Sequence, residues 1–140
     1  MSRYRRSIVL ALALVAADGC NQRDQAVAQR AAHEARHDLR ALSLRGKVEV
    51  AASQPYLIRT LADALPLSAA GRAQVHEQLQ VLQMRIDEAR DAVRALDGAP
   101  EAELAQREAA AEAAVDRLDA ARADAWSALN DAPRTQRSSS

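Results

Sequence analysis

Three residues near the start of the chain have the types and spacing needed to bind a metal ion and activate a water molecule on it. The segment His33-Glu34-Ala35-Arg36-His37 reads H-E-x-x-H. On a helix, residues i and i+4 share a face, so the two imidazoles could bind one zinc ion. Glu34 could then activate a zinc-bound water. The pattern makes His33, Glu34 and His37 the candidate metal-binding residues.

The segment resembles the zinc-binding helix of metalloproteases, but it departs from that family's pattern. Arg36 and Asp38 place charges where the family's helix is flanked by uncharged residues. The family's longer form has a glycine and a third histidine where this chain has Arg40 and Ser43. A downstream glutamate could be a third ligand, but the sequence singles none out. We therefore expect two exposed histidines on a charged helix, no metal, no cofactor and no enzymatic activity. Weak adventitious metal binding by the two histidines is one alternative, and a zinc peptidase is the remote alternative.

Cys20, the only cysteine, is the other residue with chemistry of its own. A basic start and the ten apolar residues 8–17 precede it, and Gly19 lies directly before it. This order is the layout of a secretory signal. The apolar run is too short to cross a bilayer, which takes about 20 residues. We expect residues 1–19 to be a signal peptide that is removed.

The segment resembles the signals of bacterial lipoproteins, whose usual box ends Leu-Ala-Gly-Cys. The sequence Ala17-Asp18-Gly19-Cys20 keeps the last two residues and departs at the first two. The resemblance implies that Cys20 is acylated and that membrane lipid is its partner. Asn21 does not match the aspartate that retains such lipoproteins in the inner membrane. We therefore expect an anchor facing the periplasm, in the outer rather than the inner membrane. The alternatives are secretion with a free thiol and an uncleaved anchor or cytoplasmic protein.

Charge and composition narrow the possible partners. Removal of residues 1–19 takes three of 19 basic and one of 19 acidic residues, which leaves 16 and 18 and a net charge of −2. A mixed, nearly neutral surface argues against nucleic acid, since phosphate binding needs a basic patch. A single cysteine cannot form an intrachain disulfide. The chain has no Phe and is rich in strong helix formers, so we expect thin helical packing.

The clearest helical pattern lies in the second half of the chain. Apolar residues recur there at alternating spacings of 4 and 3: Val75, Leu79, Leu82, Ile86, Ala89, Val93 and Leu96. This heptad pattern predicts one face of a long helix. Ser68 can cap its start, Gly98 can end it in a left-handed conformation, and Pro100 can open the next helix.

A second, weaker helix follows at residues 101–130. An apolar stripe continues the same heptad register along this helix, and Glu108 and Arg122 interrupt it. The stripe consists of Leu104, Ala111, Val115, Leu118, Ala125 and Leu129. The short connection before it favours antiparallel neighbours. The sequence thus predicts a long antiparallel helical hairpin of about 69–97 and 101–130. We interpret Trp126 as a packing anchor and His76 as a solvent-facing helix residue.

Residues 22–45 also predict a helix, which Gly46 is expected to end, with a thin apolar stripe: Val27, Ala31, Ala35, Leu39 and Leu42. The alternation at 48–50 is too short to predict a strand. Ser53 and Pro55 open a short helix that Pro66 closes, carrying Leu57, Ile58, Leu61 and Leu65. We predict an all-α fold, a three- or four-helix bundle in which the short helix covers one face of the hairpin.

The predicted domain organisation has four parts. A signal peptide (1–19) precedes a lipid-anchored segment and helix (20–45). The helical-hairpin domain (46–131) follows, and a polar, disordered tail (132–140) ends the chain.

The segment Leu67-Ser68-Ala69-Ala70-Gly71-Arg72 resembles the L-T-x-x-Q element of periplasmic stress chaperones and related metal sensors. Ser68 stands for the Thr, Gly71 replaces the Gln, and Leu129 is what remains of a second copy. The resemblance spans residues 65–131. It implies a helical hairpin that dimerises, cradles unfolded clients or binds metal through histidines.

Taken together, these patterns favour a small bacterial envelope lipoprotein with a non-enzymatic helical interaction domain. Its partner would be a protein or a second copy of the chain, met through the hairpin. The alternative is a stress chaperone or metal sensor of helical-hairpin type.

Overall fold

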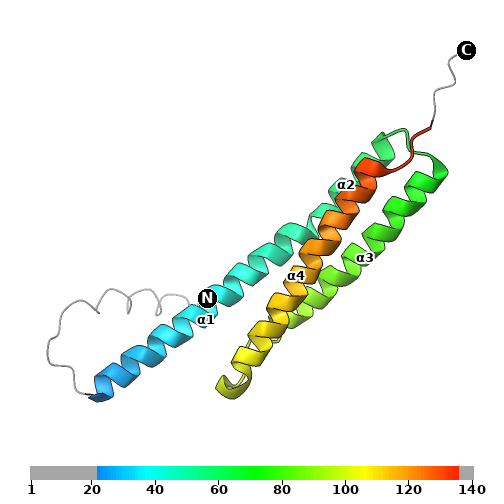
Figure 1. Ribbon diagram of the computed structural model, residues 1–140. Helices are drawn as coiled ribbons and strands as arrows, with labels where there is room; N and C mark the ends of the chain where they lie inside the picture. Colours follow the sequence, from blue (N-terminus) through cyan, green and yellow to red (C-terminus); the bar gives the residue numbers. More distant parts are fainter. Residues whose placement is uncertain (1–21, 136–140) are drawn as a thin grey trace, which may run out of the picture. The chain divides into compact units, whose positions relative to one another are not determined.

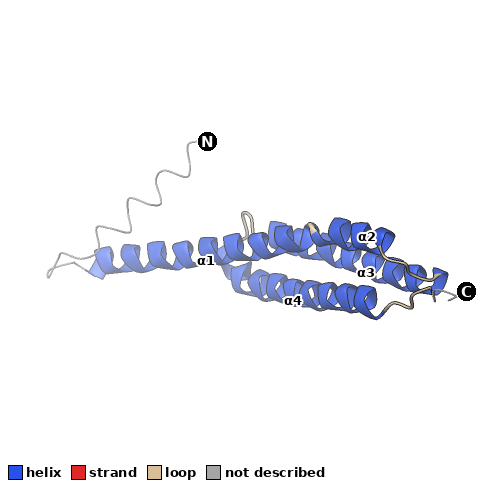
Figure 2. Cartoon of the chain, turned by 90° about the horizontal axis from the view of Figure 1, so that it is seen from above, coloured by secondary structure: helices blue, strands red, loops and turns tan. Residues whose placement is uncertain are grey.

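The computed structural model describes residues 22–135, and their regular structure is helical. The helices are α1 (Gln22–Ala52), α2 (Gln54–Ala64), α3 (Ala69–Arg94) and α4 (Glu101–Asp131). The chain divides into two compact units, residues 1–40 and 41–140, so that α1 contributes to both. The predicted all-α fold is confirmed. Figures 1 and 2 show its helices from two directions.

The antiparallel hairpin of α3 and α4 is confirmed as the centre of the second unit (Figure 1). Every member of the predicted α3 stripe is buried, with Leu82 and Ala89 0% exposed. The facing side of α4 is mostly alanine, with three larger residues: Ala111, Ala114, Val115, Leu118, Ala121, Ala125, Ala128 and Leu129. Small side chains on one helix let the larger side chains of the other pack closely, so a core forms without Phe.

The predicted cap at the start of α3 is confirmed, whereas α3 ends at Arg94, before the predicted residue 97, and Gly98 lies in the turn that follows. Ser68 has an extended backbone, and its Oγ accepts a hydrogen bond from the Gly71 N–H at 3.1 Å, which caps α3. Gly98 has φ 69°, a left-handed conformation that costs other residues about 1–2 kcal/mol. Pro100 is the N-cap residue of α4. These residues turn the chain by local preference alone.

The predicted end of the first helix at Gly46 is wrong, because α1 continues to Ala52. Glycine inside a helix costs about 1 kcal/mol relative to alanine. Leu44 and Val48, on either side of it, are 6% and 2% exposed. Burying each such side chain contributes about 1.5–3 kcal/mol, so packing outweighs the glycine. The alternation at 48–50 is helical for the same reason.

The thin stripe predicted for this helix is not buried within its unit. Val27 and Leu39 are 65% and 67% exposed in the first unit, and Leu42 is 53% exposed in the second. The residues of α1 that join the core are instead Leu44, Val48 and Ala51. Leu44 follows Leu42 by two residues, or about 200° around the helix, so the packed face lies opposite the predicted one.

Helix α2 lies against both α3 and α4, as predicted. Pro55 is in its first turn, and the helix ends before Pro66, which disfavours helical backbone in the residue preceding it. Ser53 makes no side-chain cap; its hydroxyl donates to the Val50 carbonyl at 2.7 Å. Ile58 is buried, whereas Leu57 and Leu61 of the same helix are 45% and 37% exposed.

The segment 132–135 is ordered by backbone hydrogen bonds, so the predicted disorder is wrong there; residues 136–140 lie outside the described part of the chain. Ser68 N–H donates to the Pro133 carbonyl and Thr135 N–H to the Pro66 carbonyl, both at 2.8 Å. Leu67 and Arg134 form an antiparallel bridge. We call this contact between 66–68 and 133–135 the terminal clamp. It joins the start of α3 to the end of α4.

Candidate functional site

The predicted lipidation site, Cys20, lies outside the described residues, as does the predicted signal peptide. Helix α1 begins at Gln22. Among the helices of residues 22–135, none has an apolar run long enough to cross a bilayer.

The first candidate site is the histidine pair of α1, in the unit that includes residues 22–40. His33 Nε2 and His37 Nε2 lie 2.8 Å apart and share a hydrogen bond whose direction depends on the tautomers. The two rings meet edge to face, with centroids 4.2 Å apart. Glu34 is exposed. The helix thus brings the two predicted imidazoles together, as their spacing requires.

A full zinc centre needs at least three protein ligands. Within residues 22–135, no group of three or more His, Cys, Asp or Glu side chains is placed to hold a metal ion. The catalytic geometry of a zinc peptidase is therefore not assembled by the described residues. The histidine pair supplies two possible metal ligands, the Nε2 atoms of His33 and His37.

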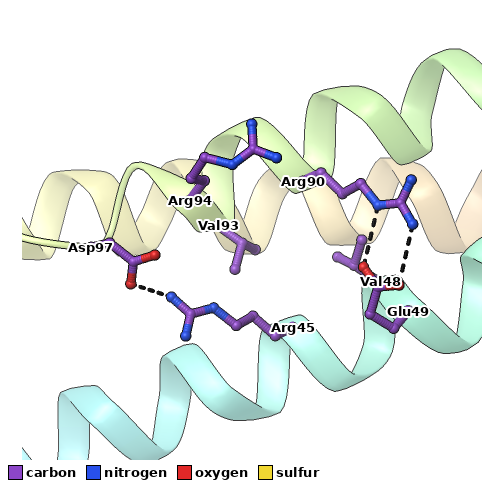
Figure 3. Close-up of a pocket in the computed structure, with 7 residues that line it drawn as sticks. All are labelled: Arg45, Val48, Glu49, Arg90, Val93, Arg94 and Asp97. Atoms are coloured by element: carbon purple, nitrogen blue, oxygen red, sulfur yellow. Dashed lines mark hydrogen bonds and ion pairs between the residues drawn. The ribbon is translucent and has the colours of Figure 1, made fainter. Parts of the chain in front are cut away.

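A second candidate is a pocket of about 200 Å³ between the last turns of α1 and the end of α3 (Figure 3). Val48 and Val93 are its apolar lining, and the other lining residues are charged: Arg45, Glu49, Arg90, Arg94 and Asp97. No part of the sequence analysis singled it out. The residues come from segments more than 40 positions apart, so only the fold brings them together.

The charges of this pocket are matched in pairs. Arg90 donates from Nε and from a terminal nitrogen to the two carboxylate oxygens of Glu49, each at 3.2 Å. Arg45 pairs with Asp97, and Arg94 pairs with Asp91 on its own helix. The hydrogen bonds that Arg90 donates to Glu49 raise the pKa of Arg90, against a smaller opposing effect of burial.

Paired arginines offer little to an incoming anion, because a ligand would have to displace a carboxylate already in place. The Arg90 and Glu49 side chains are 38% and 65% exposed, so solvent screens their attraction. The arrangement joins α1 to α3 within the second unit. Its geometry is that of a surface ion-pair cluster.

The two remaining residues singled out from the sequence have structural partners. Trp126 packs against the core, and its indole N–H donates to Gln54 Oε1 at 3.0 Å, which ties α4 to α2. This confirms the predicted packing role. His76 is exposed, as predicted, and its Nε2 lies 3.1 Å from the Gln80 amide nitrogen.

Gly71 explains one departure from the L-T-x-x-Q pattern. A Cβ at this position would lie 2.6 Å from the Pro133 carbonyl oxygen, closer than real contacts allow. The terminal clamp therefore leaves no room for the glutamine of that pattern.

Helix α2 carries exposed apolar side chains that the sequence did not predict. Tyr56, Leu57 and Leu61 of α2 are 79%, 45% and 37% exposed. In contrast, Met84 is the single large hydrophobic residue that the described helices α3 and α4 expose to a similar degree. We call Tyr56, Leu57 and Leu61 the α2 face. Tyr56 lies between Pro55 and the apolar residues 57–58, and a sequence reading alone cannot tell which of these points outward.

Comparison with known proteins gives no match: no family model, no curated protein and no solved structure corresponds to this chain. The fold defines a small all-α protein built on an antiparallel helical hairpin with a third helix packed on it.

Proposed function

We propose that this protein is a small bacterial envelope lipoprotein, anchored through an acylated Cys20, whose helical domain acts by contact with another protein. The observation that carries the proposal is the order of residues 3–20: basic, apolar, small, then the only cysteine. Acylation would convert that cysteine into the membrane contact of a chain whose net charge gives it little attraction to anionic lipid.

Acyl chains on Cys20 would suffice as the membrane contact, so the helical domain would not have to supply one. A single myristoyl-type chain binds membranes only marginally, whereas several acyl chains on one residue hold a protein stably. The domain itself needs no apolar surface for anchoring. Its exposed apolar residues are then available for a partner.

The α2 face is the surface we assign to that contact. The hairpin uses its heptad stripe to pack α3 on α4, since Leu82 and Ile86 are at most 1% exposed. That stripe is therefore not available to contact a client protein or a second copy of this chain. Tyr56, Leu57 and Leu61 expose apolar area, and aromatic residues are enriched where proteins meet.

Fractionation and intact mass test the anchor. The wild-type protein should sediment with outer-membrane vesicles, with a mass above that of the bare polypeptide from residue 20. Cys20→Ala should appear in the soluble fraction. Asn21→Asp is the matched control, because it should keep the acyl mass and move the protein toward the inner membrane. A mature mass equal to the bare polypeptide would rule the anchor out.

Photo-crosslinking tests the contact surface separately. A photoreactive residue in place of Leu57 should give crosslinked products in cells. The same residue in place of Met84 is the control, because the two positions are 45% and 48% exposed and differ mainly in the helix that carries them. Equal crosslinking at both positions would contradict the assignment of the α2 face.

A further inference from the structure

The histidine pair of α1 is held in a geometry that suits a metal ion as well as a proton. His33 Nε2 and His37 Nε2 lie 2.8 Å apart, and α1 places the two residues on one face, four positions apart. Imidazole nitrogens are common ligands of zinc, copper and nickel. The question is which geometry this separation fits.

The distance between two ligand atoms follows from the bond length and the angle at the metal. With metal–nitrogen bonds of about 2.0–2.1 Å, two ligands at right angles lie about 2.8–3.0 Å apart, and two at the tetrahedral angle about 3.3–3.4 Å apart. The hydrogen-bonded nitrogens are 2.8 Å apart, so they need almost no movement to bind an ion at right angles, whereas a tetrahedral ion requires them to separate by about half an ångström. Right angles are typical of the square-planar and tetragonal sites of copper(II) and nickel(II), whereas structural zinc is tetrahedral.

The geometry points to a two-histidine chelate at His33 and His37 for a divalent copper or nickel ion, with water in the remaining positions. In the metal-free protein the two Nε2 atoms are joined by a hydrogen bond, whose hydrogen belongs to one of the two rings. On binding, that hydrogen moves to Nδ1 of its own ring, which leaves one lone pair on each Nε2 for the metal. No proton needs to leave the protein, and no redox step occurs.

The rest of the site fits a solvent-open ion. His33 is exposed and His37 is half-buried, so water can complete the coordination. The chelate needs no third protein ligand, in accord with the absence of a three-residue cluster among residues 22–135. It differs from a zinc peptidase centre, because Glu34 has no role in it. It does not depend on acylation.

Calorimetric titration with Ni²⁺ tests the chelate. The full chain should carry Cys20→Ser, so that the thiol does not compete, and no polyhistidine tag. We expect one Ni²⁺ per chain, bound more weakly than Cu²⁺, as the general order of affinities requires, and more tightly than Zn²⁺. His33→Ala or His37→Ala should each weaken Ni²⁺ binding at least about tenfold, since one of two ligands is lost.

Two controls separate this chelate from general histidine binding. His76→Ala should leave the affinity unchanged, because that imidazole has a glutamine rather than a histidine at i+4. The double change Ala35→His, His37→Ala keeps the number of histidines but moves one off the shared face, and it should not restore binding. Far-ultraviolet circular dichroism should show the same helix content in every variant.

Three outcomes would overturn the inference. One is Ni²⁺ affinity that is unchanged in His33→Ala, and another is an equal loss in His76→Ala. The third is Zn²⁺ binding that is tighter than Ni²⁺ binding, because it would mean that the pair opens to the tetrahedral spacing. Because Cys20 is replaced throughout, failure here leaves the proposed lipid anchor untouched.

Discussion

Leu82→Ala is the sharpest test of the hairpin. Leu82 is 0% exposed at the middle of α3, and it packs in the core shared with α4. Leucine-to-alanine changes at such positions cost about 2–5 kcal/mol, because the transfer energy and a cavity term add. The alanine-rich face of α4 has few large side chains that could move into the space, so we expect about 3 kcal/mol, near the middle of that range.

That loss is large for a domain of this size. Domains typically have about 5–15 kcal/mol of total stability. A loss of about 3 kcal/mol should lower Tm by roughly 12–24 °C, at about 4–8 °C per kcal/mol for a domain of 60–100 residues. Thermal unfolding followed by far-ultraviolet circular dichroism measures it directly.

Met84→Ala is the matched control for this change. Met84 lies on the same helix and loses a side chain of similar size, but it is 48% exposed. Alanine is also the better helix former, so Tm should change by no more than a few degrees. Equal shifts for Leu82→Ala and Met84→Ala would refute the argument that the α3 stripe is the buried seam.

Two further predictions use other pairs of positions. Gly46→Ala should raise stability by about 0.5–1 kcal/mol, because a Cβ there meets nothing within 4 Å. Gly71→Ala should instead lower stability by about 1–3 kcal/mol, because its Cβ would be overpacked against Pro133. Urea unfolding measures both changes, and a gain equal to that of Gly46→Ala would show that the terminal clamp moves aside at no cost. A double-mutant cycle on Glu49 and Arg90 should give a coupling of about 0.2–1 kcal/mol that falls with added salt, whereas a larger, salt-independent coupling would mean that the pair is screened less than its exposure implies.

The hairpin could be predicted because its signals are local and agree with one another. The heptad stripe of α3, the cap at Ser68 and the left-handed turn at Gly98 each specify the same two helices. The course of α1 could not be predicted in the same way. A glycine inside the helix is a local signal to stop, but Leu44 and Val48 are buried by residues distant in sequence. Tertiary packing therefore decides where α1 ends.

The candidate sites likewise combine features that local sequence specifies with features that depend on the folded structure. The spacing of His33 and His37 predicts that they share a helix face, whereas the separation of their Nε2 atoms depends on side-chain rotamers that no sequence pattern records. The pairing of Glu49 with Arg90 joins residues 41 positions apart, and nothing in either local sequence points to the other. The terminal clamp is made largely by backbone groups, which every residue carries, so it leaves no compositional trace.

The terminal clamp also has a consequence for the order of folding. Its Thr135–Pro66 contact spans 69 residues, and the nearby Trp126–Gln54 contact spans 72. Loop closure grows costlier with length, by about 0.6 kcal/mol for each doubling, whereas the turn at Gly98 closes among near neighbours. The helices of the hairpin should therefore pack together first near that turn and last at the open end. The amide hydrogens of Ser68 and Thr135 would then be among the last to gain protection during refolding and among the first to exchange in the native state.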